Sequence, residues 1–400
     1  MTMEFAYYPG CASCATGLAY DMSTRYIART IGLKLRVIPD WNCCGASAAH
    51  LVNRDLSLAL PARSLALSEK RLPGLDVVAS CAACFGRLKT TRHFARESNE
   101  NRAHLESLID REYRAEANVF SLLQIIAEND DIKEAIQARM TKVLSGLKIA
   151  CYYGCMLVRP TEVVEFDDEE NPQSMDDILR LVGAEPVDWA FKSYCCGASL
   201  QVTEPSAGKT MVEKILHNAQ INGAEAIATA CPLCQLNVDM RQKEVNWLTG
   251  SSYDLPVYYF TELIALCLGA TPKEIGLDKH YNPAVTCASS KLKDPRVAAA
   301  EAAAEAEAAA AAAKPKPRPK PKTEDTTSAA AAEPQPEVVT TTEPVAATPV
   351  AAEPQPEVDV AAEPVAVTPV AAEPQPEVVT TTEPVAAEPQ PANDDKVVAP

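Results

Sequence analysis

The sequence lacks the features of an exported or membrane-embedded protein. Its opening residues, MTMEFAYYPGCASC, have neither the basic start nor the apolar core of a signal peptide. No apolar run approaches the roughly 18 residues that would suggest a membrane span. These absences predict a cytoplasmic protein without a transmembrane segment. In such a reducing compartment, clustered cysteines indicate metal or redox chemistry more often than structural disulfides.

Several binding motifs are missing as well. The chain has no G-x-G-x-x-G, no P-loop and no G-x-S-x-G, so we expect no flavin, nicotinamide or nucleotide on this chain. The net charge is -17, and residues 297–400 carry 18 acidic against 6 basic side chains, so the rest of the chain is nearly neutral. No basic stripe for nucleic acid is present, and the five histidines share no metal-binding spacing.

The C-terminal part has the composition of a disordered segment. AAEPQPEV begins at residues 331, 351 and 371, and the valines between the prolines are too sparse to bury a core. We therefore predict a disordered tail over 291–400, with a transient helix in its Ala/Glu-rich start. A solubilising or spacing role is favoured over a docking segment.

What the sequence does have is 14 cysteines, ten of which form two matching groups. CCGAS occurs at residues 43–47 and again at 195–199, and each copy has one cysteine before it and a C-x-x-C after it. The numbers of intervening residues are 31, 0, 36 and 2 in the first group and 39, 0, 34 and 2 in the second. The first group is Cys11, Cys43, Cys44, Cys81 and Cys84; the second is Cys155, Cys195, Cys196, Cys231 and Cys234.

Each cysteine motif follows a short apolar segment typical of a β-strand, and helical patterns separate these segments. This order predicts an α/β fold of two pseudo-repeated domains, at 1–94 and 147–290, joined by a helical connector at 95–146. Ligands of open α/β sheets gather beyond the carboxyl ends of the strands. We therefore expect each group to converge on one point.

Five cysteines per group limit what a group can hold. A tetrahedral zinc site or a cubane [4Fe–4S] cluster takes four thiolates and leaves one over. Disulfides would need an oxidising compartment, and a bridge between adjacent cysteines is awkward. A cluster that uses all five thiolates is the remaining option. The spacing itself shows only two equivalent five-cysteine sites.

These residues resemble a known family. The repeated C…CCG…C-x-x-C pattern is similar to the CCG domain, and CYYGCMLVRP at 151–160 with KSYCCGASL at 192–200 resembles the catalytic B subunit of heterodisulfide reductase. The resemblance covers about residues 4–270, extends to the B-like subunits of bacterial complexes, and leaves the tail out.

The resemblance implies two non-cubane [4Fe–4S] clusters, one on each cysteine group, with a substrate disulfide cleaved between them. Since each cluster supplies one electron at a time, we expect the two groups to line opposite walls of one cleft. It also implies an iron–sulfur C subunit and a flavin-containing A subunit as partners, and a small disulfide or thiol as substrate. The sequence thus predicts an oxidoreductase acting on a sulfur group, in either direction. The alternative is an electron-relay subunit that has no thiol substrate of its own.

Other residues are weaker candidates. Arg159, Lys192, Arg87 and Lys89 follow or flank the motifs and could attract an anionic substrate or tune a cluster potential, although ordinary surface roles are favoured for such charges. The remaining cysteines have no counterpart in the repeat: Cys14, Cys151, Cys267 and Cys287. Of these, Cys267 lies in an apolar run typical of a buried thiol.

Overall fold

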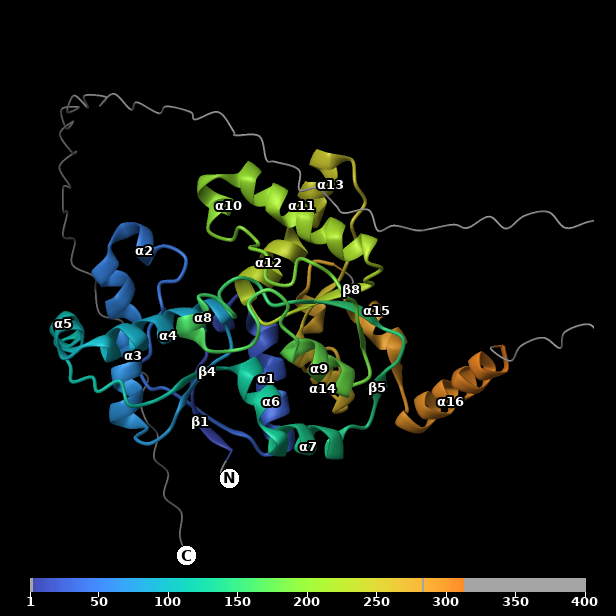
Figure 1. Ribbon diagram of the computed structural model, residues 1–400, viewed down its shortest axis with the longest axis horizontal. Coiled ribbons are helices and arrows are strands. Elements are labelled where there is room, and N and C mark those ends of the chain that lie inside the picture. The colour runs from blue at the N-terminus through green and yellow to red at the C-terminus, as the bar shows by residue number, and fades with distance from the viewer. Residues whose placement is uncertain (1–2, 283, 313–400) are drawn as a thin grey trace, which may run out of the picture. The chain divides into compact units, whose positions relative to one another are not determined.

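Two four-stranded parallel sheets with the same strand order form the framework of the protein (Figure 1). The computed structural model describes residues 3–282 and 284–312. The first sheet has the order β2-β1-β3-β4 and the second the order β7-β6-β8-β9. The strands are β1 (Glu4–Tyr8), β2 (Lys34–Val37), β3 (Val77–Ala79), β4 (Val119–Ser121), β6 (Lys148–Tyr152), β7 (Glu185–Pro186), β8 (Ala226–Thr229) and β9 (Val257–Tyr259). The predicted α/β fold with two repeated units is confirmed.

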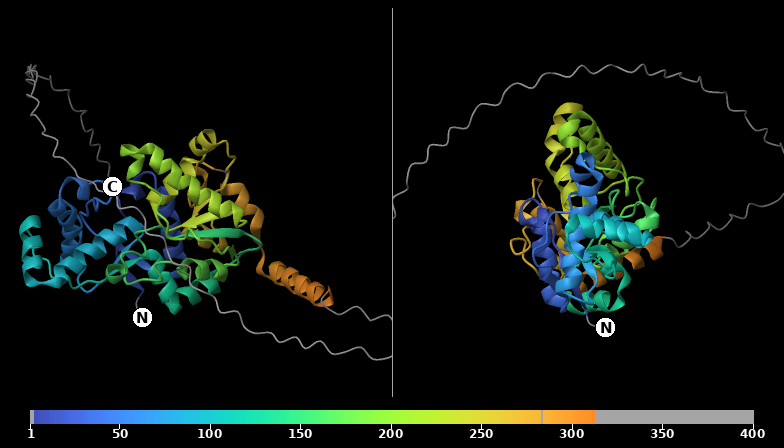
Figure 2. Two further views of the ribbon diagram at one scale, coloured as in Figure 1. Left: turned by 45° about the horizontal axis from the view of Figure 1, so that its top comes forward. Right: turned by 90° about the vertical axis from the view of Figure 1, so that its left-hand side faces the viewer.

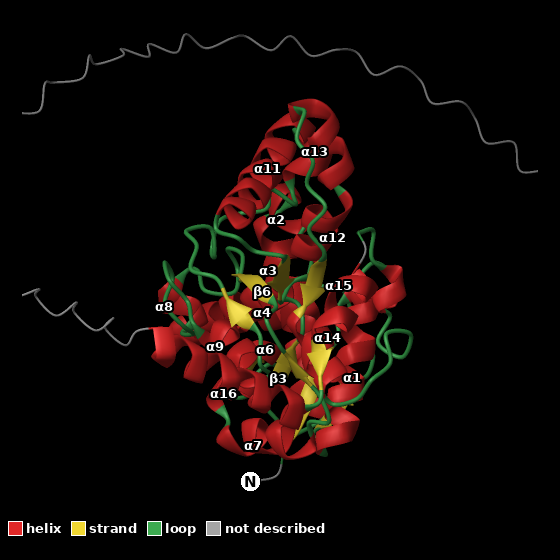
Figure 3. Ribbon diagram, turned by 90° about the vertical axis from the view of Figure 1, so that its right-hand side faces the viewer, coloured by secondary structure: helices red, strands yellow, loops and turns green. Residues whose placement is uncertain are grey.

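The central strands are buried because helices surround both sheets (Figure 3). Every residue of β3 and of β8 is buried. Parallel strands that are covered on both faces have such continuous apolar sequences. In the first half the helices are α1 (Leu18–Ile31), α2 (Ala49–Val52), α3 (Arg54–Arg71), α4 (Ala82–Glu97), α5 (Asn99–Ile109), α6 (Leu122–Glu128) and α7 (Asp130–Arg139), with the 3₁₀ turn η1 (Cys11–Cys14).

The second half repeats this plan. Its helices are α8 (Thr161–Val164), α9 (Ser174–Leu181), α10 (Leu200–Thr203), α11 (Pro205–Ile221), α12 (Pro232–Met240), α13 (Gln242–Thr249), α14 (Phe260–Cys267), α15 (Ala284–Lys291) and α16 (Pro295–Ala312), with the 3₁₀ turn η2 (Leu277–Lys279). A small antiparallel pair, β5 (Val143–Leu144) with β10 (Leu292–Lys293), joins the connector to the C-terminal part of the second half.

The two halves pack through equivalent helices. α1 contacts α14 of the second half, and α6 contacts α9, which is the counterpart of α1. In the first of these contacts Tyr20 stacks on Tyr259 with ring centroids 4.4 Å apart, and the hydroxyl oxygens of Ser23 and Thr261 lie 2.7 Å apart. Both halves belong to one compact unit, so their borders at residues 94 and 147 stay a prediction.

Two segments differ from what the sequence predicts. Residues 95–146 contain helices as expected, but they also supply β4, the outer strand of the first sheet. Residues 291–312 fall in the predicted disordered tail, yet they complete α15 and form β10 and α16. The helix α16 lies where the Ala/Glu-rich sequence predicts a transient one, since alanine and glutamate have high helix propensity, whereas β10 and the end of α15 differ from the prediction. α16 extends away from the sheets (Figures 1 and 2). Residues 313–400 lie outside the described residues.

Candidate functional site

The cysteine motifs lie beyond the carboxyl ends of the central strands, as the sequence predicts. Cys11 follows β1, and Cys81 follows β3 at the start of α4. In the second half Cys155 follows β6, and Cys231 follows β8 at the start of α12. Because β1 and β3 are neighbours, as are β6 and β8, each sheet brings the first cysteine of its group close to the C-x-x-C pair.

The sulfur atoms of the first group form two close pairs. Cys43 Sγ lies 3.5 Å from Cys11 Sγ, and Cys44 Sγ lies 3.3 Å from Cys84 Sγ. The adjacent residues Cys43 and Cys44 thus point to different partners, as successive side chains in an extended segment do. Cys11 and Cys43 are exposed, whereas Cys44, Cys81 and Cys84 are buried.

The second group repeats this pairing. Cys155 donates a hydrogen bond to Cys195, and Cys234 interacts in the same way with Cys196. The two groups meet at Cys81 and Cys231, whose sulfur atoms lie 4.0 Å apart. The ten cysteines of the two motifs are therefore one connected cluster of thiols at the contact between the halves.

Hydrogen bonds within the cluster favour the thiolate form at three sulfurs. The pKa of Cys44 is lowered to about 4, chiefly by side-chain hydrogen bonding with Cys43 and Cys84, and also by the Ala46 backbone and the charge of Arg87. Cys155 lowers the pKa of Cys195 to about 6. Cys234 and Cys81 hold the pKa of the Cys231 thiol well below its usual range. Thiolates are the form in which cysteine binds metal.

Glycine and tyrosine shape both sites in the same way. A methyl group on Gly10 would lie 3.1 Å from Cys84 Sγ, and one on Gly154 would lie 3.1 Å from Cys234 Sγ. Two residues before each glycine is a buried tyrosine, Tyr8 or Tyr152, whose hydroxyl donates to the carbonyl preceding the Cys-Cys pair at 2.5 or 2.6 Å. The sequence analysis missed these residues, although the alignment of YPGC with YYGC carries the signal.

A cavity of about 190 Å³ lies between the halves, and all five cysteines of the second group line it. The first half contributes mostly small side chains to its wall: Ala46, Ser47, His50, Ala82, Ala83 and Arg87. Among the described residues, no cysteine of the first group lines this cavity. The expectation that both groups line one cleft is therefore wrong for this cavity, whose first-half wall includes Ala82 and Ala83 and none of the first five cysteines.

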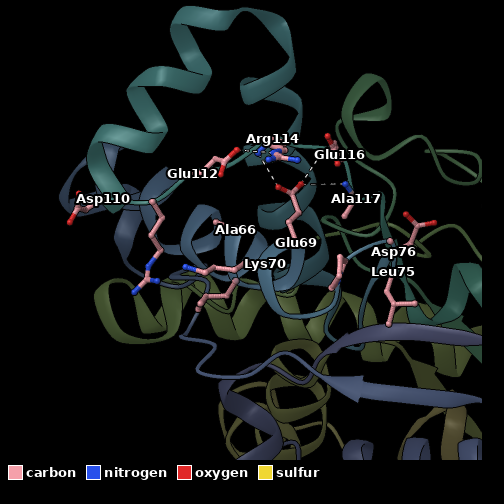
Figure 4. Close-up of a pocket in the computed structure, with 14 residues that line it drawn as sticks. Ala66, Glu69, Lys70, Leu75, Asp76, Asp110, Glu112, Arg114, Glu116 and Ala117 are labelled. Atoms are coloured by element: carbon pink, nitrogen blue, oxygen red, sulfur yellow. Dashed lines mark hydrogen bonds and ion pairs between the residues drawn. The ribbon is translucent and has the colours of Figure 1, made fainter.

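A larger cavity, of about 710 Å³, lies away from the cysteines between α3 and the loop after α5 (Figure 4). Its lining is rich in charged side chains, and Glu69 points into the loop (Figure 4). The Glu69 carboxylate accepts hydrogen bonds from the backbone N–H groups of Arg114 and Glu116, at 2.9 and 2.7 Å. Glu69 thus holds the loop in place, which accounts for its position without a ligand.

Comparisons with known proteins agree with this geometry. The model of the CCG cysteine-rich domain family matches residues 5–89 and 149–239, one match in each half. The chain is 33% identical over 281 residues to the 8-methylmenaquinol:fumarate reductase membrane anchor subunit of Wolinella succinogenes, covering 70% of this chain and 96% of that protein. It is 30% identical to the B subunit of the ferredoxin/F(420)H(2)-dependent CoB-CoM heterodisulfide reductase of Methanosarcina acetivorans, covering 69% and 93%.

The chain belongs to the family of heterodisulfide reductase B subunits and their relatives. A solved structure of a hypothetical protein from Helicobacter pylori has a similar fold, with a TM-score of 0.53 at 11% sequence identity, and the match covers 70% of this chain and 52% of that one. The likeness to the Helicobacter pylori protein extends to the fold alone.

The residues present fit the iron–sulfur clusters that the family implies. Each half offers five thiols, hydrogen bonding lowers the pKa of three of the ten while raising that of their partners, and Gly10 and Gly154 leave room that a side chain would fill. Within the part of the chain that the structure describes, no three His, Cys, Asp or Glu side chains are arranged around a single metal ion. No helix in those residues is long and apolar enough to cross a membrane.

The other four cysteines lie apart from the ten. Cys151 is in β6 and is fully buried. Cys267 is buried in α14 and donates to the carbonyl of Val182 at 3.7 Å, as expected of a structural thiol. Cys14 is exposed in η1, and Cys287 is half-buried in α15.

Lys192 has a structural partner rather than a free charge. Its side chain is buried, and its ammonium lies 3.0 Å from the Asp176 carboxylate, which also accepts a hydrogen bond from Tyr153 at 2.7 Å. The Lys192 carbonyl accepts the N–H groups of Tyr153 and Gly154. This network holds the segment that leads to Cys155 in place. Because the Lys192 ammonium is paired with Asp176, it is not the free charge that would attract an anionic substrate.

Replacing Lys192 with methionine is expected to lower the free energy of unfolding by about 3 kcal/mol or more, because the buried Asp176 would lose its close cation and keep only Arg180, 4.0 Å away. Denaturant unfolding followed by circular dichroism measures this loss. Lys89→Met is the matched control: Lys89 pairs with Glu165, whose side chain is mostly exposed, so its loss should cost less than about 1 kcal/mol. Equal losses in the two variants would contradict a special role for the Lys192 network.

Proposed function

We propose that this chain is the iron–sulfur subunit of a complex that reduces or forms a disulfide-type sulfur bond. The observation that carries the proposal is the contact between the two cysteine groups at Cys81 and Cys231, beside a cavity lined by the second group. In the reducing direction, one disulfide takes up two electrons and two protons and yields two thiols.

The proposed cofactors are two non-cubane [4Fe–4S] clusters, each of which supplies one electron at a time. The first five cysteines would hold one cluster and the second five the other. Two one-electron centres that meet at Cys81 and Cys231 suit a two-electron reaction, since neither centre has to deliver both electrons.

The protein's own residues have three tasks in this proposal. The ten cysteines hold the clusters as thiolates, and hydrogen bonds already favour that form at Cys44, Cys195 and Cys231. Gly10 and Gly154 let the backbone approach closely. The small side chains Ala82 and Ala83 leave space beside the second group in which a sulfur compound can reach it.

Electrons would come from partner proteins, for which we propose the iron–sulfur C subunit and the flavin-containing A subunit. Three exposed apolar side chains, Leu51 and Val52 on α2 and Val202 on α10, support contact with another protein. Both helices follow a Cys-Cys-Gly motif, so a protein that docks there would lie near the exposed Cys43. The cytoplasmic location stays a prediction.

A second candidate is an electron-relay subunit that takes electrons from a quinol. The observation in its favour is the 33% identity to a subunit of a methylmenaquinol:fumarate reductase, 96% of which is covered. In that case the cavity beside the second group would bind no thiol.

Iron analysis and EPR spectroscopy distinguish the two candidates. The proposal predicts about eight irons per chain on anaerobically purified protein, and an EPR signal of the oxidised protein that changes when a thiol is added. A signal that responds to a quinol analogue and ignores thiols would select the relay. Zinc in place of iron would contradict both.

A further inference from the structure

The two halves differ at the cavity. The C-x-x-C motif of the first half is Cys81-Ala82-Ala83-Cys84, and that of the second half is Cys231-Pro232-Leu233-Cys234. Pro232 packs against the first half so closely that a methyl group on Gly17 would meet its ring at 3.0 Å. Ala82, the counterpart of Pro232, instead lines the open cavity. The cavity is therefore formed beside the C-x-x-C motif of the first half, and the equivalent position in the second half is filled by Pro232.

The third residue after each C-x-x-C motif differs as well. In the second half it is Asn237, whose amide donates to the carbonyl and the sulfur of Cys196 at 3.3 and 3.8 Å. In the first half it is Arg87, which lines the cavity. The Nε atom of Arg87 is buried and has no hydrogen-bond partner among the described residues.

The unpartnered Nε of Arg87 is a hydrogen-bond donor that an anion in the cavity would satisfy, beside the interaction of the Arg87 charge with Cys44. The lining contains the Arg87 cation and no aspartate or glutamate, so no carboxylate of the described chain neutralises it there. A buried polar atom without a partner is costly, and a bound oxyanion would recover that cost through charge-assisted hydrogen bonds. The volume of about 190 Å³ is below the ~300–1,000 Å³ of pockets for drug-sized ligands, so it suits a small molecule or the end of a longer one.

We propose that Arg87 binds an anionic group, such as a carboxylate, of the thiol or disulfide substrate and so directs the substrate sulfur toward the second cysteine group. This inference rests on the sulfur chemistry proposed above and adds to it the charge of the substrate and the residue that selects it. His50 and Ser47 line the same cavity from the first half.

The test compares two thiols of the same size, 3-mercaptopropionate and its neutral amide, 3-mercaptopropionamide. Each is titrated into the oxidised, cluster-containing protein, and the EPR change gives its dissociation constant. We expect the wild-type protein to bind the carboxylate about tenfold more tightly or better. Arg87→Gln should remove this preference while leaving the affinity for the amide unchanged, and Arg87→Lys should keep part of it.

Arg29→Gln is the matched control, because it removes the same charge at an exposed position of α1 outside the cavity lining. Equal binding of the two thiols by the wild-type protein would overturn the inference, and so would a preference that survives in Arg87→Gln. A changed reduction potential with an unchanged preference would likewise overturn it, since Arg87 would then act on the cluster. If Arg87→Gln loses iron, the inference is tested by two other results: the preference of the wild-type protein for the carboxylate over the amide, and the part of that preference that Arg87→Lys keeps.

Failure of the proposed function has a different signature. In that case neither thiol changes the signal of the wild-type protein, whereas a quinol analogue does. The role of Arg87 in substrate binding would then fall with it. A thiol response without a charge preference leaves the function intact and removes only the role of Arg87.

Discussion

Cys196→Ala is expected to remove one of two clusters and to abolish turnover. Cys196 is buried, its sulfur pairs with Cys234, and Asn237 donates to both its carbonyl and its sulfur, so no other thiol can take its place without a backbone shift. Iron should fall from about eight to about four atoms per chain, and one EPR signal should disappear. Iron and acid-labile sulfide analysis with EPR on the anaerobic protein measures both.

The first group provides a reciprocal variant, Cys44→Ala, which should remove the other signal. Cys14→Ala is the control, because Cys14 is an exposed thiol three residues from Cys11 and should leave both signals unchanged. Cys196→Ser tests whether any loss reflects unfolding, since serine keeps the size of the side chain. A Cys196→Ala protein with full iron and both signals would mean that the cluster uses four other thiolates, and the five-cysteine assignment would be wrong.

The inner strands of both sheets could be predicted because their ends carry the cysteine motifs. The segment EFAYY before Cys11 and the segment AIATA before Cys231 are apolar runs that stop at a motif, and they form β1 and β8. The outer strands β4 and β9 were missed. Each has three residues and leads directly into a helix, so its apolar letters merge with those of α6 or α14.

The contact between the cysteine groups could not be read from the sequence. Cys81 and Cys231 are 150 residues apart, and their 4.0 Å separation depends on how the two sheets pack through α1 with α14 and α6 with α9. The spacing of the cysteines along the chain predicts which residues form each group, but it carries no information on how the two halves are oriented relative to each other. The position of the cavity, by contrast, could be predicted from the sequence. When the two C-x-x-C motifs are aligned, the small Ala82 and Ala83 of CAAC stand where CPLC has proline and leucine, and the smaller side chains leave space.

The residue before the first cysteine of each group is a glycine in the left-handed backbone region, which favours glycine. Gly154→Ala is therefore expected to disrupt the second site: Gly154 has φ near 71°, and the added methyl group would lie 3.1 Å from Cys234 Sγ. A left-handed backbone conformation costs a non-glycine residue roughly 1–2 kcal/mol. In addition, the methyl group would push Cys234 Sγ, a proposed cluster ligand, out of its position. We expect iron to fall toward about four atoms per chain, with loss of the same EPR signal as in Cys196→Ala.

Gly146→Ala separates these two effects. Gly146 has φ near 66°, but a methyl group there would meet no atom within 4 Å, so this variant carries the backbone strain without the sulfur contact. It should unfold more readily and still hold about eight irons. Gly10→Ala, with the same 3.1 Å contact to Cys84 Sγ, should empty the first site instead. If Gly154→Ala keeps its full iron while its stability drops as in Gly146→Ala, the glycine serves only the turn, and the cluster does not need the close approach of the backbone.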